Sequence, residues 1–107
     1  LLGWTGDNGD PDNFMGVLLG CAAAESGGNR ARWCHEEFDS LLNQARQLTD
    51  QAERTTLYEQ AQEIFKEEAP WVTIAHSVAF KPVRAEVTGF KVHPLGSHIF
   101  YDGVDLK

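Results

Sequence analysis

Two amphipathic stretches separated by a short break constrain the fold of this chain most. From Glu36 to Leu48, apolar residues recur at a helical spacing and fall on one face. A second stripe follows the break at Thr49-Asp50 and ends before Pro70, because a residue that precedes proline avoids the α region. The two stripes consist of Phe38, Leu41, Leu42, Ala45 and Leu48, and of Leu57, Tyr58, Ala61, Ile64 and Phe65. The pattern predicts an αα-hairpin whose stripes face a common core.

Charged residues near the expected helix ends favour the same two helices. Glu36 and Glu37 lie near the start of the first helix and Arg46 lies near its end, which complements the helix macrodipole. Asp50 followed by Glu53 resembles a capping box with Asp in place of Ser or Thr. The second helix is therefore expected to begin directly after Asp50.

The chain opens on a short apolar run that breaks into a turn rich in glycine, asparagine and aspartate. The turn reads Gly6-Asp7-Asn8-Gly9-Asp10-Pro11-Asp12. Its glycines, asparagine and proline are the residues that tight turns favour. We expect Asp12 or Asn13 to cap a helix that continues from Phe14 towards Ala24, although Gly16 and Gly20 weaken that helix. A carboxylate on such a turn can accept hydrogen bonds from an ammonium group, but most turns of this composition bind nothing.

The residues after Pro70 favour extended structure. Trp71 to His76 is rich in β-branched and aromatic residues, which predicts a strand. Val78 to Pro82 is expected to extend that strand or pair with it. Val87 to Val92 is interpreted as a strand or an extended loop, and His98 to Tyr101 as a last short strand. The element order is thus a turn and a helix, two long helices, and then several short strands.

The two cysteines, Cys21 and Cys34, flank a segment whose Ser26 to Asn29 indicates a flexible loop. A disulfide across this loop would restrict the unfolded chain, but the spacing alone leaves a bond and free thiols equally open. Nothing nearby completes a zinc site of the CxxC type.

The charge of the chain excludes some partners. Nine basic and sixteen acidic residues give a net charge of −7, which disfavours nucleic acid and anionic membrane surfaces. No apolar run approaches the roughly 18 residues of a membrane-spanning helix, so we expect no membrane insertion of this segment. The chain does not begin with Met and opens within an apolar run. We therefore expect it to be part of a longer protein.

Catalytic and metal-binding roles are weakly supported. No nucleophile elbow, P-loop or HExxH motif occurs, and the dipeptide His76-Ser77 alone does not make a catalytic pair. Asp7, Asp10 and Asp12 miss the EF-hand pattern, and no pair of histidines has the helical i, i+4 spacing. A calcium loop of another geometry stays open. We expect no catalytic residue, no metal ligand and no cofactor, and hence a protein that is not an enzyme.

Several motifs together resemble those of the solute-binding proteins of bacterial dipeptide and oligopeptide ABC importers, most of all the proteins that bind dipeptides. The matching pieces are Gly3-Trp4-Thr5-Gly6-Asp7-Asn8-Gly9-Asp10-Pro11-Asp12-Asn13, Cys21 and Cys34 around Trp33, Ala75-His76-Ser77, Pro82-Val83-Arg84 and Asp102. The resemblance runs over essentially the whole chain. Proteins of that family are several times longer, and this chain resembles their C-terminal part only.

The resemblance implies an α/β fold, the C-terminal part of a two-lobed periplasmic-binding-protein fold of type II. Residues 1–107 would form one fragment of the peptide-binding domain without an internal boundary. The match to the family's cysteine pair, together with an oxidising periplasm, implies a disulfide between Cys21 and Cys34. The expected location is periplasmic, or lipid-anchored outside the cytoplasmic membrane.

The resemblance also implies a function and a site. The expected function is to capture dipeptides or short peptides and deliver them to an inner-membrane ABC permease, as a monomer when full-length. Asp7 matches the family's aspartate for the peptide α-ammonium, and Trp4, Thr5 and Gly6 would lie beside a peptide that binds like an added strand. The family's arginine for the peptide carboxylate lies upstream of the matched stretch, so that role falls to none of Arg30, Arg32, Arg46, Arg54 and Arg84. Relatives for haem, nickel complexes or glutathione, and a structural or metal-binding domain without ligand affinity, remain alternatives.

Overall fold

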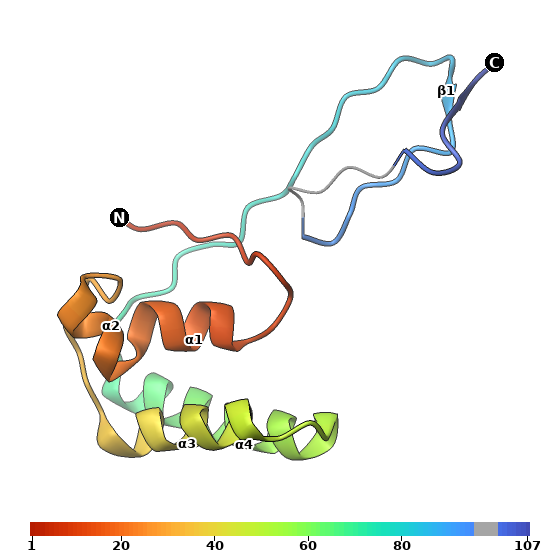
Figure 1. Cartoon of the computed structure of the whole chain (residues 1–107). Coiled ribbons are helices and arrows are strands. Elements are labelled where there is room, and N and C mark those ends of the chain that lie inside the picture. Colours follow the sequence, from red (N-terminus) through yellow and green to blue (C-terminus); the bar gives the residue numbers. More distant parts are fainter. Residues whose placement is uncertain (96–100) are drawn as a thin grey trace. The chain divides into compact units, whose positions relative to one another are not determined.

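The computed structural model describes residues 1–95 and 101–107, and the chain divides into two units, residues 1–73 and 74–107 (Figure 1). The first unit is fully described and is built from helices. These are α1 (Asp12–Leu19), α2 (Cys21–Ser26), α3 (Glu36–Gln47) and α4 (Gln51–Glu68). In the described part of the second unit, the regular structure consists of β1 (Val87–Thr88) and β2 (Asp105–Leu106).

Helices α3 and α4 form the predicted αα-hairpin, and α1 packs across it. The core of the first unit consists of Met15, Leu18 and Leu19 from α1, Phe38, Leu42 and Ala45 from α3, and Tyr58 and Ala61 from α4. The predicted core residues Leu41, Leu57, Ile64 and Phe65 are half-buried and pack against it. The two apolar stripes therefore face a common core, as their spacing predicts, except for Leu48, which follows the end of α3 and is not part of that core.

Side chains at the predicted positions define the ends of the hairpin helices. Asp50 accepts a hydrogen bond from the backbone N–H of Glu53 at 2.9 Å, so the predicted cap of α4 is confirmed. α4 ends at Glu68, two residues before Pro70. At the start of α3, His35 accepts from the backbone N–H of Phe38 through Nδ1. Both helices thus begin at a side chain that satisfies one of the free N–H groups of the first turn.

The single helix expected from Phe14 to Ala24 is wrong, because the chain breaks at Gly20. Gly20 is extended, with φ −59° and ψ 152°, and separates α1 from α2. The backbone N–H of Cys21 then bonds to Oδ1 of Asp39 on α3, at 2.9 Å. The break redirects the chain so that Cys21 faces the loop that returns from α2.

That returning loop is tied to α1 and α2 by a disulfide and a buried asparagine. Cys21 and Cys34 are bonded, with their Cα atoms 4.7 Å apart, which confirms the disulfide that the resemblance implied. Asn29 is almost fully buried and donates through Nδ2 to the carbonyl oxygens of Leu19, at 3.0 Å, and Trp33, at 2.7 Å. One side chain therefore joins the end of α1 to the residue before Cys34.

Thiol titration checks the disulfide directly. Protein made in an oxidising compartment and denatured without reductant is expected to contain no titratable thiol, because these are the only cysteines of the chain. A titration of the 107-residue chain after reduction supplies the matched positive control. Two reactive thiols per chain before reduction would contradict the prediction.

The second unit contains fewer strands than expected. The predicted strands Trp71–His76 and Val78–Pro82 are wrong, since these residues form no strand in the structure. β1 covers only the start of the segment expected from Val87 to Val92, and it pairs antiparallel with β2, with Val87 opposite Leu106. The last predicted strand lies largely outside the described residues. A strand needs a hydrogen-bonded partner, and among the described residues none lies beside residues 71–82.

Within the described residues, no helix combines the length and the apolar character needed to cross a membrane.

Candidate functional site

The turn at the start of the chain is fixed by its own side chains. Asn8 Oδ1 accepts a hydrogen bond from the backbone N–H of Asp10 at 3.0 Å, and Asp10 Oδ1 accepts from the backbone N–H of Asp12 at 2.9 Å. The N-cap position of α1 is Pro11, whose side chain makes no cap bond. The prediction that Asp12 or Asn13 caps this helix is therefore wrong. Asp10 satisfies the first N–H of the helix because it lies two residues before it, the usual reach of an Asp side chain.

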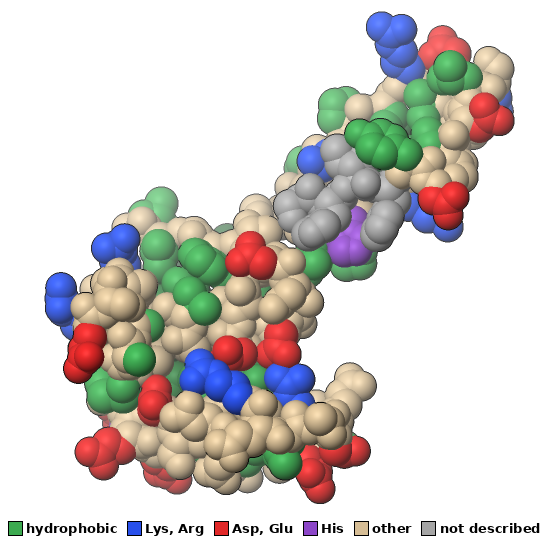
Figure 2. Space-filling view, in the orientation of Figure 1, with side chains coloured by type: hydrophobic (Ala, Val, Ile, Leu, Met, Phe, Trp, Pro, Cys, Tyr) green, Lys and Arg blue, Asp and Glu red, His purple; other side chains and the backbone are tan. Residues whose placement is uncertain are grey.

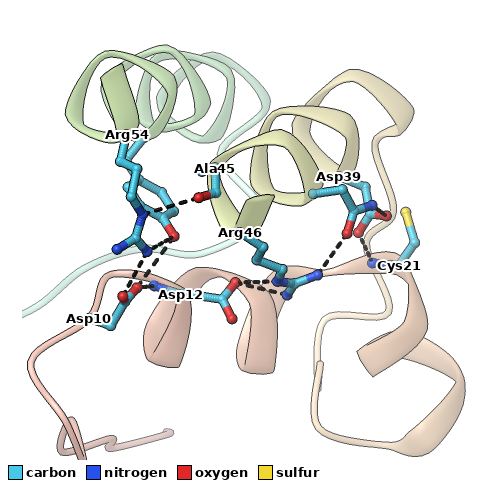
Figure 3. Close-up of polar contacts among 9 residues, drawn as sticks. Asp10, Asp12, Cys21, Asp39, Ala45, Arg46 and Arg54 are labelled. Carbon is cyan, nitrogen blue, oxygen red and sulfur yellow. Dashed lines mark hydrogen bonds and ion pairs between the residues drawn. The ribbon is translucent and has the colours of Figure 1, made fainter. Parts of the chain in front are cut away.

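Asp10 also joins the turn to α4. Its Oδ2 lies 2.7 Å from Nη2 of Arg54, and the hydroxyl of Tyr58 donates to its Oδ1 at 3.3 Å. Arg54 donates in addition to the carbonyl oxygen of Ala45 and lies over the ring of Tyr58. Figure 3 shows Arg54 reaching from α4 to Asp10. The contact spans 44 residues of sequence, so it holds the turn against the αα-hairpin.

These contacts shift the acid–base properties of the cluster. Burial alone raises the pKa of Asp10, but the N–H of Asp12 and the guanidinium of Arg54 outweigh it and hold the pKa below its ordinary value. The hydrogen bond to Asp10 raises the pKa of Arg54. Burial raises the pKa of the Tyr58 hydroxyl. At neutral pH Asp10 is therefore an ionised carboxylate whose charge is balanced by the guanidinium of Arg54.

A second ion pair joins α1 to α3. Asp12 Oδ1 lies 2.8 Å from Nη2 of Arg46 (Figure 3). Arg46 also donates a hydrogen bond through Nη1 to Oδ1 of Asn43. A side chain at Gly16 would displace the ends of both members of the pair, so the glycine leaves room for the ion pair as it stands. In Figure 2, acidic and basic side chains adjoin one another on this face of the first unit. Two of the three aspartates of the turn are thus already paired with arginines.

Removal of the Asp10 charge tests this arrangement. Asp10→Asn is expected to lower the melting temperature by a few degrees at neutral pH, because the variant keeps the turn oxygen but loses the charge that Arg54 pairs with. The folded-state pKa is depressed, so the ionised carboxylate stabilises the fold above the ordinary pKa of 3.8. That advantage is lost as the pH falls through the lower folded value. The measurement is melting temperature against pH for both proteins.

Glu67→Gln removes one exposed charge from the same unit and is the matched control. A gap between wild type and Asp10→Asn that stays constant down to acid pH would contradict the ion pair.

Asp7, the predicted ammonium ligand, is held by a neutral side chain. Asn13 Nδ2 donates to Asp7 Oδ2 at 3.2 Å, and Asn13 Oδ1 accepts from the backbone N–H of Asp7 at 3.0 Å. The same Oδ1 accepts from Nε1 of Trp4 at 3.2 Å. Among the described residues, no basic side chain pairs with Asp7, and its Oδ1 makes no hydrogen bond.

The four predicted ligand-binding residues are consecutive in the sequence and precede α1. Trp4, Thr5 and Asp7 are exposed, and Gly6 is buried. A Cβ at Gly6 would lie 2.7 Å from the ring of Phe14, so glycine lets the chain pass closely over α1. Across the part of the chain that the structure describes, no group of three or more His, Cys, Asp or Glu side chains is arranged to hold a metal.

The residues that support this site were missed by the sequence analysis. Arg46 was assigned to the helix macrodipole, and Arg54 and Tyr58 were given no role in the site. Their partners lie 34 to 48 residues away, and no local pattern links positions so far apart. Asn13 was read as part of a motif and as a possible cap. Its position could have indicated a supporting role, because Asn13 directly follows a turn that carries three carboxylates.

Comparison with solved structures supports the expected fold. The structure of HbpA2 from Haemophilus parasuis superposes with a TM-score of 0.86 at 42% identity, over 97% of this chain and 20% of that protein. The likeness is consistent with a segment of a periplasmic-binding-protein fold. No family model matches the chain.

Comparison with curated proteins is more specific. The chain is 53% identical to Di/tripeptide-binding protein 4 of Pseudomonas aeruginosa (strain UCBPP-PA14) and 51% identical to the Dipeptide-binding protein of Escherichia coli (strain K12), in each case over 100 residues. It is 48% identical over 101 residues to Heme-binding protein A of Haemophilus influenzae. The matches cover 94% of this chain but only 18–19% of the relatives. The chain therefore matches a segment of the dipeptide-binding proteins, which confirms the resemblance found in its sequence.

Proposed function

We propose that this chain belongs to a longer protein that captures dipeptides or short peptides in the periplasm and delivers them to an inner-membrane ABC permease. In this proposal Asp7 pairs with the α-ammonium of the peptide. The observation that carries it is the state of the three turn carboxylates. Asp10 and Asp12 are paired with arginines, whereas Asp7 has no basic partner among the described residues. Of the three carboxylates of the turn, Asp7 is therefore the one that can pair with the cationic group of a ligand.

The backbone beside Asp7 supports the same ligand. In the part of the chain that the structure describes, the N–H and C=O groups of Trp4, Thr5 and Gly6 make no backbone hydrogen bond. An extended peptide can therefore pair with this stretch as an added strand, with its ammonium placed at the end of the ladder. Such recognition reads the backbone and the terminal charge, and it tolerates many side chains.

The remainder of the proposal concerns the whole protein. The relatives named as dipeptide-binding proteins are about five times as long as this chain, which leaves room for the second lobe and for a group that binds the peptide carboxylate. We propose that the full-length protein is a monomeric binding protein and not an enzyme. A ligand enclosed between two lobes strengthens the charge pair, because water is excluded from it.

Haem is a second candidate ligand, because one relative of similar identity is named a haem-binding protein. Haem carries carboxylates and no ammonium group. Asp7, held without a basic partner, would repel a haem carboxylate and favours a ligand with a positive end. The peptide proposal therefore agrees better with the charge of this turn.

Calorimetric titration of the full-length protein with dialanine and with N-acetyl-dialanine tests the proposal. Acetylation removes the positive charge and adds bulk at the same position, so it is expected to weaken binding by roughly 30-fold or more. Haemin serves as the third ligand in the same buffer. Equal affinity for the two peptides, or binding of haemin alone, would refute the ammonium-binding role.

A further inference from the structure

The side chain of Asn13 is bonded to two of the four proposed ligand-binding residues. A carboxamide has two donor hydrogens and two acceptor lone pairs. In Asn13, Oδ1 accepts from Trp4 Nε1 at 3.2 Å and from the backbone N–H of Asp7 at 3.0 Å, while Nδ2 donates to Asp7 Oδ2 at 3.2 Å. Three of its four bonding positions therefore fix the Trp4 ring and both the backbone and the carboxylate of Asp7.

Asn13 lies in a part of the chain that is fixed by more contacts than Trp4 and Asp7, the residues to which its side chain is hydrogen-bonded. It lies in the first turn of α1, where its N–H bonds to the carbonyl oxygen of Asp10 at 3.0 Å. Asp10 and Asp12, which precede Asn13, are tied to the hairpin through Arg54 and Arg46 respectively (Figure 3). Trp4 and Asp7, in contrast, are exposed residues outside any helix or strand. Asn13 therefore transmits the fixed position of α1 to a stretch that lacks regular structure of its own.

An amide suits this position better than a cation would. Arg46 and Arg54 neutralise Asp12 and Asp10, so those carboxylates have little charge left to offer a ligand. The neutral amide of Asn13 orients the carboxylate of Asp7 without cancelling its charge. It occupies Oδ2 and leaves Oδ1 open to a third partner.

We propose that Asn13 is a positioning residue that orients the Asp7 carboxylate and the Trp4 indole for recognition of the peptide ammonium. This inference rests on the proposed function. Asn13 acts through Asp7 and does not itself contact the ammonium. Its effect on binding therefore depends on the charge of Asp7.

A double-mutant cycle in the full-length protein tests that dependence. Asn13→Ala is expected to weaken dialanine binding by roughly tenfold or more, since a hydrogen bond to the charged group is lost. On an Asp7→Asn background the same change is expected to have little further effect, because the charge to be oriented is already gone. Asn13→Ser is the second variant, since serine is favourable near a helix start and yet too short to make all three bonds.

Asn8→Ala is the matched control. Asn8 lies in the same turn and also accepts one backbone hydrogen bond, but that bond comes from Asp10 and not from Asp7. Its effect on affinity should be small and should add to that of Asp7→Asn.

The outcomes separate the two proposals. If Asp7→Asn weakens binding but Asn13→Ala and Asn13→Ser weaken it by the same factor with and without Asp7, Asn13 is merely structural and the inference fails. Unchanged affinity in both Asn13 variants would overturn it as well. If Asp7→Asn itself binds dialanine like the wild type, the proposed ammonium site fails, and the role of Asn13 fails with it.

Discussion

Asp7→Asn in the full-length protein is expected to lower the affinity for dialanine by roughly 30- to 5000-fold. The substitution keeps the shape of the side chain and one oxygen but removes the negative charge. Loss of one partner of a desolvated charge pair typically costs about 2–5 kcal/mol, which gives that range. Calorimetric titration at one pH and one salt concentration measures the change.

The two neighbouring aspartates are built-in controls. Asp10→Asn and Asp12→Asn remove the same charge from the same turn, but their carboxylates are paired with Arg54 and Arg46. They should reduce thermal stability and change dialanine affinity much less. Wild-type binding by Asp7→Asn together with loss of binding by Asp10→Asn would mean that the ammonium-binding role was assigned to the wrong carboxylate.

Phe38→Ala is the substitution with the largest expected effect on stability. Phe38 is fully buried in the core of the first unit, and its ring centroid lies 4.9 Å from that of Trp33. Truncation leaves a cavity that rigid helices fill only in part, so the free energy of unfolding should fall by roughly 3–5 kcal/mol. Urea unfolding of the 107-residue chain measures the loss.

Two other phenylalanines, which are less buried than Phe38, provide comparison variants for the same experiment. Phe65 is half-buried against Trp71, with ring centroids 6.2 Å apart, and Phe65→Ala should cost less than Phe38→Ala. Phe80 is 83% exposed in the second unit, so Phe80→Ala should change the unfolding midpoint of this chain little. Equal midpoints for all three variants would contradict the described core.

The hairpin was predictable because its signals are local. A helix satisfies its backbone within each turn, so the periodic apolar residues and the Asp50 cap specify α3 and α4 without reference to distant residues. The strands after Pro70 depend on partners elsewhere. Val72, Ile74 and Phe80 are residue types that favour strands, but their side chains are exposed. No strand among the described residues pairs with this segment. Composition alone cannot supply the second strand of a ladder.

The support of the candidate site was hidden for a related reason. The turn itself was visible in the sequence, because its glycines, proline and aspartates act on neighbouring residues. The pairing of Asp10 with Arg54 and of Asp12 with Arg46 exists only after α1 has packed on the hairpin. The sequence therefore does not show that two of the three aspartates are paired with arginines and that Asp7 has no basic partner among the described residues. This difference is visible only in the folded chain.

A crystal structure of the full-length protein with bound dialanine tests the central claim most directly. We expect the peptide nitrogen to lie about 2.7–2.9 Å from Oδ1 of Asp7, the length of a charge-assisted hydrogen bond, while Oδ2 stays bonded to Asn13. An ammonium group held by other residues, with Asp7 facing solvent, would contradict the proposed site.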